Sequence, residues 1–137
     1  MDMTLDEIKD FLNEFDRFSK CNGMKLVVLR EGYAEAEMEL TCNALNGLDI
    51  AQGGAVFTLA DLALAGAANS HGVHAVAMNS NIAYVRPGLG KTLRAIAREV
   101  NRGKRTGLYD IEVFNDQNKL VAKMTSTAFY HETRFTR

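Results

Sequence analysis

The chain has 137 residues, of which 47% are hydrophobic and 24% charged, and its formal net charge is −1. These values are typical of one globular domain that buries a substantial core. No run of basic residues supplies the positive surface that binds nucleic acids or anionic membranes, so neither is an expected partner. The acidic start lacks the basic and apolar stretches of a leader peptide. We therefore expect a single cytoplasmic domain over residues 1–137.

The first forty residues predict a helix followed by a β-hairpin. Thr4 and Glu7 have the spacing of a capping box, and apolar residues then recur at helical intervals. We expect an amphipathic helix over residues 4–17 that lies on the outside of the domain. From residue 24 the pattern alternates instead, which predicts strands over residues 24–30 and 33–40. The glutamates of the second strand are expected to face solvent.

A long apolar helix is predicted over residues 53–69, and its single charged residue is Asp61. The segment is short for a membrane span, so a helix buried in the core fits better. Burying a carboxylate is costly, so Asp61 is expected to face water, a partner or a reacting group.

Four further strands are predicted after this helix, and the last residues of the chain are expected to be frayed. The strands cover residues 74–85, 91–101, 106–114 and 119–130. The whole pattern indicates an α+β domain in which an antiparallel sheet curls around the one helix that has no exposed face.

The cysteines and histidines do not indicate a metal site or a disulfide framework. Cys21 and Cys42 form no metal-binding motif, and two such residues are typical of free, packed thiols. His71 and His74 supply two ligands without a third nearby, which is too few for a zinc site. We expect no metal.

The two sides of the predicted helix differ in side-chain size. At about 100° per residue, small residues share the side of Asp61, and bulkier residues lie on the other side. Gly54, Thr58, Ala65 and Ala68 lie on the Asp61 side, and the bulkier branched residues Val56 and Leu59 lie on the other side together with Ala63 and Gly66. The small residues leave room for a ligand or for a second subunit, and composition alone does not decide between them.

Two glycines at the start of the helix favour a ligand. Gly53 and Gly54 leave the first backbone N–H groups open at the positive end of the helix dipole, as in the oxyanion hole of an acyl-transfer enzyme. Asp61 lies about 12 Å further along the helix, too far to share one substrate carbonyl within a chain. An antiparallel pair of helices brings the two together, which predicts a composite site in a homodimer.

These residues resemble a known motif. Asn46, the triplet Gln52-Gly53-Gly54, Leu59 and Asp61 follow the pattern HNxxGxxHGGxxxxLxD of the hotdog-fold acyl-CoA thioesterases, in the PaaI-like branch of phenylacetate degradation. The resemblance extends over roughly residues 20–130. It implies a six-stranded antiparallel sheet wrapped around one long central helix, with a short helix before it. It also implies homodimers, paired into tetramers.

The resemblance also implies roles for single residues. Asp61 takes the place of the catalytic carboxylate, Gly53 that of the oxyanion amide, and Asn46 that of a polar residue that orients water or the thioester. Gln52 replaces the usual histidine, and it can donate an N–H but cannot carry a proton. Thr58 is expected to offset the burial of Asp61. Residues expected to line the substrate site are Gly54, Phe57, Thr58, Ala77 and Tyr84.

The implied reaction is hydrolysis of an aryl-acetyl or short-to-medium acyl-CoA, with Asp61 as nucleophile or general base. Coenzyme A belongs to the substrate, so no separate cofactor is expected. Candidate cations for its phosphates are Arg86, Arg102, Lys104 and Arg105. One alternative is an acyl-CoA-binding sensor without catalysis. Another is an acyl-thioester hydratase or dehydratase. That chemistry usually relies on a histidine paired with an acid, and no histidine lies near the glycine pair in the sequence, which counts against it.

Overall fold

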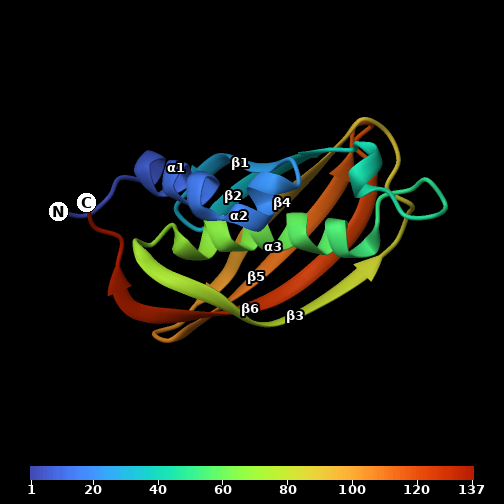
Figure 1. The fold of residues 1–137 in the computed structure, drawn as a ribbon. Coiled ribbons are helices and arrows are strands. Elements are labelled where there is room, and N and C mark those ends of the chain that lie inside the picture. Colours follow the sequence, from blue (N-terminus) through green and yellow to red (C-terminus); the bar gives the residue numbers. More distant parts are fainter.

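Six antiparallel strands form one sheet around a central helix in the computed structural model, which describes residues 1–137 (Figure 1). The strands are β1 (Met24–Arg30), β2 (Tyr33–Glu39), β3 (Val73–Tyr84), β4 (Thr92–Arg102), β5 (Thr106–Asn115) and β6 (Leu120–Arg134). Their order across the sheet is β1-β2-β4-β5-β6-β3, so β1 and β3 are the two edges. The predicted α+β architecture is confirmed.

The central helix α3 (Gly53–Asn69) packs against the concave face of the sheet. Small side chains on the inner faces of β2 and β4 allow this close approach. These are Ala34 and Ala36 on β2 and Ala95 and Ala97 on β4, all without solvent exposure. The closest approach is at Gly66, where an added Cβ would lie 2.8 Å from both Ala34 Cβ and Leu26 Cδ2. No helix of the structure combines the length and the apolar character needed to cross a bilayer.

One side of α3 stays open, which corrects the expectation of a helix without an exposed face. Val56, Leu59, Ala63 and Gly66 are buried against the sheet, as the helical periodicity predicts. Gly54 is exposed, and Phe57, Thr58, Asp61 and Ala65 are only partly buried. Ala68, which was expected on the open side, is 1% exposed and belongs to the core. The open side is therefore a stripe centred on Asp61.

The predicted N-terminal helix is two helices. In α1 (Leu5–Phe15), Glu7 N–H donates to Thr4 Oγ1 at 3.2 Å and Thr4 N–H donates to Glu7 Oε1 at 3.1 Å, which confirms the capping box. The chain turns at Asp16, whose carboxylate caps α2 (Arg17–Cys21) by accepting from Ser19 N–H at 3.0 Å. Sequence periodicity missed this break because the apolar spacing continues through it.

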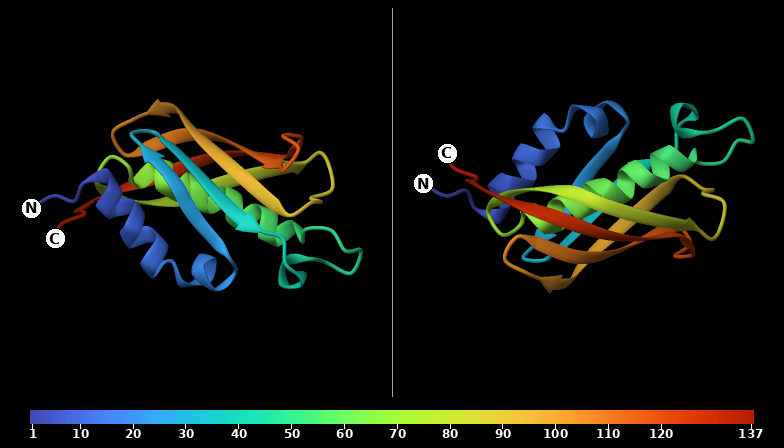
Figure 2. Two further views of the ribbon diagram at one scale, coloured as in Figure 1. Left: turned by 90° about the horizontal axis from the view of Figure 1, so that it is seen from above. Right: turned by 90° about the horizontal axis from the view of Figure 1, so that it is seen from below.

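Both ends of the chain lie side by side, and the predicted fraying of the last residues is wrong (Figures 1 and 2). β6 runs to Arg134, and the Phe135 side chain, 5% exposed, packs into the core. Met3 N–H donates to the Phe135 carbonyl at 3.1 Å. Arg137 pairs with Glu7 at 2.6 Å. The polar composition of the tail concealed these contacts, which come from the other end of the chain.

The histidines and cysteines have separate surroundings. His71 Nε2 lies 2.6 Å from Glu99 Oε1, and its side chain is 3% exposed. His74 lies instead against a phenylalanine ring, 4.5 Å between centroids. Cys21 and Cys42 are free, as expected, but both are exposed rather than packed. They lie on α2 and on a short 3₁₀-helix, η1 (Cys42–Ala44).

We expect Gly66→Ala to lower the free energy of unfolding by about 1–2 kcal/mol. The added methyl must displace Leu26 and Ala34, and overpacking of this kind outweighs the about 1 kcal/mol that alanine gains over glycine within a helix. A urea titration measures the loss. Gly47→Ala is the matched control, because no heavy atom lies within 4 Å of its added Cβ. Equal losses in the two variants would contradict the close helix–sheet contact.

Candidate active site

The first turn of α3 presents two free backbone donors. Gln52 is the N-cap, and its Oε1 accepts from Ala55 N–H at 3.0 Å. Neither Gly53 N–H nor Gly54 N–H donates a hydrogen bond within the chain. A Cβ at position 54 would lie 2.7 Å from Gln52 Oε1, so glycine here makes room for the capping side chain. The two free donors at the positive end of α3 can bind a developing oxyanion.

Asn46 lies in the same pocket as Gly53. Its Oδ1 accepts from Leu48 N–H at 2.8 Å and from Ile50 N–H at 3.4 Å, which holds the loop before α3 in shape. Its Nδ2 donates to no group of the chain, so it remains available to a ligand. The pocket has a volume of about 390 Å³. The structure thus brings together two of the residues predicted to be catalytic.

Tyr84, at the end of β3, and Arg86, two residues later, line this pocket too. The Tyr84 hydroxyl donates to the Gly53 carbonyl at 2.7 Å, so it fixes the start of α3 against the sheet. Arg86 Nη1 donates to the Leu120 carbonyl at 2.7 Å and is exposed. One candidate cation for coenzyme A therefore lies beside the free N–H groups.

Asp61 lies two turns along α3, on the open side of the helix. Burial raises the pKa of its carboxyl group, and the nearby carboxylate of Asp16 raises it further. No group of the same chain donates a hydrogen bond to it. Thr58 does not offset the burial as expected, because its hydroxyl donates to the Gly54 carbonyl at 2.9 Å. Asp61 and Ala77 of β3 line a separate hollow of about 240 Å³.

A third and larger pocket, of about 500 Å³, lies on the other side of the first turn of α3. Gln52, Gly54 and Thr58 form one wall, and the opposite wall comes from α2, β1, β2 and η1. Sequence analysis missed that opposite wall. Its residues come from segments that are far apart in the sequence and share no motif, so no linear pattern signals it.

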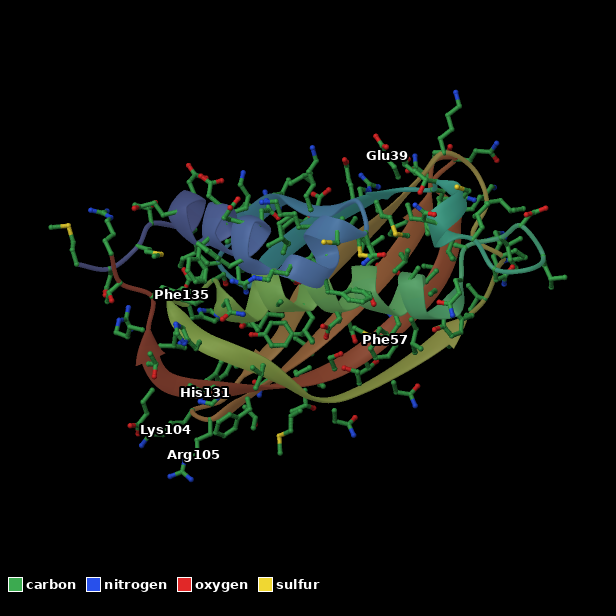
Figure 3. All side chains as sticks on the ribbon, viewed as in Figure 1. Glu39, Phe57, Lys104, Arg105, His131 and Phe135 are labelled. Atoms are coloured by element: carbon green, nitrogen blue, oxygen red, sulfur yellow. The ribbon has the colours of Figure 1, made fainter.

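The other predicted site residues are spread over the molecule. Phe57 packs partly against the core and lines none of the three pockets. Arg102, Lys104 and Arg105 lie around the turn between β4 and β5. Figure 3 shows Lys104 and Arg105 at the end of the molecule that lies opposite the start of α3. Within one chain, this basic turn does not reach the glycine pair.

Comparisons with known proteins agree with this architecture. The model of the thioesterase superfamily matches residues 49–122. Acyl-coenzyme A thioesterase PaaI of Escherichia coli is 44% identical over 110 residues, 80% of this chain and 79% of that protein. A putative esterase of Archaeoglobus fulgidus is 37% identical over 126 residues, 91% of this chain and 82% of that one.

Solved structures lead to the same family. The E. coli PaaI structure superposes with a TM-score of 0.88 at 38% identity, covering 93% of both chains. Protein smu.793 of Streptococcus mutans, bound to acetyl CoA, has a TM-score of 0.76 at 34% identity over 81% of this chain and 90% of that one. The chain belongs to the thioesterase superfamily. Within it, the chain is a PaaI-like hotdog thioesterase.

We expect Asp61→Asn to raise the melting temperature at neutral pH. The folded state raises the pKa of Asp61, so the ionised carboxylate destabilises the fold above that pKa, and the neutral amide removes this penalty. Below the ordinary aspartate pKa of about 3.9 the carboxyl is protonated in both states, so the difference should vanish. Thermal unfolding from neutral to acidic pH measures this. A lower melting temperature at neutral pH would disprove the uncompensated burial of Asp61.

Proposed function

We propose that the protein hydrolyses the CoA thioester of an aryl-acetyl or short-to-medium acyl group to the free acid and CoA. The observation that carries the proposal is the pair of free N–H groups on Gly53 and Gly54, with Asn46 beside them and the unpaired carboxylate of Asp61 on the same helix. A relative named as an acyl-CoA thioesterase and a similar structure bound to acetyl CoA support this substrate class.

The proposed active site needs two copies of the chain. Asp61 and Gly53 are separated by about 12 Å along α3, so they act on one carbonyl only across a subunit boundary. The free edge of β3 supports such a dimer. On this strand Val76 and Met78 are 54% and 64% exposed, and only β6 pairs with it. A two-fold axis beside β3 makes the two α3 helices antiparallel, and two dimers then form the proposed tetramer.

In the proposed mechanism, the thioester oxygen accepts hydrogen bonds from the Gly53 and Gly54 N–H groups of one subunit. Gln52 Oε1 accepts the hydrogen bond of the helix cap, which leaves the Nε2 group of the same side chain free to act as a third donor. The partner subunit's Asp61 either attacks the carbonyl carbon or takes a proton from water, which then attacks. In the general-base route the C–S bond breaks and Asp61 passes its proton to the sulfur, so the acid and CoA are released together. In the nucleophilic route CoA leaves as the thiolate, which takes a proton from solvent, and water then hydrolyses the acyl–Asp61 anhydride to the free acid. A raised pKa suits the general-base role, since it brings Asp61 closer to working pH.

The coenzyme A arm is assigned to the pocket that holds Arg86. The arm would pass Asn46 and Tyr84, and Arg86 would contact its phosphates. Lys104 and Arg105 lie at the other end of the molecule, and Arg102 ends the strand that leads into the same turn, so all three are proposed to reach CoA only from a neighbouring subunit.

The alternatives predict different products. A hydratase would need a proton-carrying histidine, whereas none of the three pockets around α3 is lined by one. A sensor would bind acyl-CoA and release no thiol. Thiol release from a panel of aryl- and alkyl-CoA thioesters therefore tests the proposal directly, and its complete absence would overturn it.

We expect Asp61→Asn to keep the fold and to lower kcat by at least about 10³-fold, because the amide is neither a nucleophile nor a base. Thiol release measured with a colorimetric reagent gives the rate. For the native enzyme, kcat/KM should rise with pH through the raised pKa of Asp61, so the acidic limb should lie above the ordinary aspartate range. Unchanged turnover in the variant would remove Asp61 from the mechanism.

We expect Gly53→Pro to lower kcat by about 10²–10³-fold, the effect of losing one oxyanion donor. Proline removes the N–H but is favoured at the first position of a helix. Gln52 has φ −64° and ψ 135°, the extended conformation that a following proline requires. The side-chain contact with Tyr84 would be ordinary, at 3.4 Å from the new Cβ.

Mixing the two variants tests the composite site. In a heterodimer of Asp61→Asn and Gly53→Pro subunits, one site keeps both native groups and the other loses both. We expect purified heterodimers, carrying a different tag on each subunit, to recover about half of native activity. If each site were built within one chain, both sites would be damaged and no activity would return.

A further inference from the structure

We propose that the 500 Å³ pocket between α2 and α3 holds the acyl group of the substrate, and that α2 determines which acyl groups fit. This inference rests on the proposed thioesterase function. It narrows the substrate class to medium-chain or arylalkyl thioesters, which fill the pocket, over acetyl, which does not. Small-molecule pockets commonly have volumes of about 300–1,000 Å³, and an acetyl group needs far less.

The position of the pocket relative to the free N–H groups indicates which part of the substrate it holds. The first turn of α3 separates two pockets: Gly54 lines the 500 Å³ pocket and Gly53 lines the 390 Å³ pocket. A thioester carbonyl held at these two residues has two substituents, the acyl group and the sulfur of the CoA arm. Arg86, which suits the phosphates of CoA, lies in the smaller pocket. The acyl group is then left to the larger one.

The lining of the larger pocket suits an apolar group. Met24 and Met38, 4% and 1% exposed, come from β1 and β2, and Leu45 adds a further apolar surface. Methionine side chains are flexible and adapt to ligands of different shape. Polar residues, among them Asn22 and Glu39, complete the lining, and Figure 3 shows Glu39 at the rim of the fold.

An exposed aromatic side chain on α2 forms part of the opposite wall. Phe18 lines the pocket although it is 64% exposed. Its segment is held in place, because Asp16 caps α2 and Asn22 Nδ2 donates to the Phe18 carbonyl at 2.7 Å. An acyl group in the pocket would cover the ring and remove apolar surface from water. The superfamily match begins at residue 49, so this wall lies outside the matched core.

Two substitutions test the pocket by its size. Ala44→Leu narrows it, and we expect the ratio of kcat/KM for octanoyl-CoA over acetyl-CoA to fall roughly 10- to 100-fold. Phe18→Ala removes a contact and should lower the same ratio about 3- to 10-fold. Phe15→Ala is the matched control, because Phe15 is 51% exposed on α1 and does not line the pocket. Its ratio should equal the native one.

Cys21 provides a binding readout that needs no turnover, since it lines the pocket and is exposed. In an Asp61→Asn, Cys42→Ser background, octanoyl-CoA should slow labelling of Cys21 by a maleimide several-fold, whereas acetyl-CoA, which also has no free thiol but leaves the pocket unfilled, should not. The acyl pocket would be overturned if the native protein releases thiol, Ala44→Leu and Phe18→Ala leave the octanoyl-to-acetyl ratio of kcat/KM unchanged, and octanoyl-CoA does not protect Cys21. That outcome would leave the proposed thioesterase function standing. Absence of thiol release from every thioester would instead overturn the proposed function.

Discussion

The close contact between α3 and the sheet is the constraint on which the site depends. A glycine in the helix and alanines on two central strands let the backbones approach so closely that a Cβ added at Gly66 would lie 2.8 Å from Ala34 Cβ and Leu26 Cδ2. This contact fixes the rotation of α3, since Gly66 must face the sheet. The rotation in turn leaves Gly54, Thr58 and Asp61 on the open side. Packing on one side of the helix thus sets the chemistry on the other.

The ionised carboxylate of Asp61 lowers the stability of a single folded chain. Its carboxylate is partly buried, its neighbour Asp16 repels it, and no donor of the chain compensates it. Such a cost is typical of functional sites, where stability is exchanged for reactivity. The free N–H groups at the start of α3 are the complementary feature, donors without an acceptor. Each chain carries both unpaired halves, and in the proposed dimer Asp61 of one subunit and the N–H groups of the other meet at one substrate carbonyl.

Much of the fold was predictable from periodicity and local chemistry. Alternation located the six strands to within a few residues, and the capping box located the start of α1. Sequence analysis missed the local break at Asp16 and two sets of contacts between distant segments: the packing of Phe135, just after β6, and the wall that α2 contributes to the larger pocket. For the site, glycines at a helix start and one charge in an apolar run point to Gly53 and Asp61, and the roles of these two residues stay predictions. The hydrogen bond of the Thr58 hydroxyl was not predictable, because a threonine within a helix can donate to the backbone carbonyl four residues earlier, here that of Gly54, instead of to a side chain.

The contacts between the two chain ends bear on how this protein can be tagged and how its specificity can evolve. Arg137 lowers the pKa of Glu7 to about 2, and Arg134 pairs with Asp2 at 3.0 Å, so the last residues hold the start of α1 even in mild acid. α1 leads directly into α2, the proposed wall of the acyl pocket. Under the proposal that α2 selects the acyl group, an affinity tag, a fusion partner or a protease cut at the carboxyl end is expected to alter substrate choice through α1. Terminal extensions offer evolution a route to new specificity that leaves the catalytic helix unchanged.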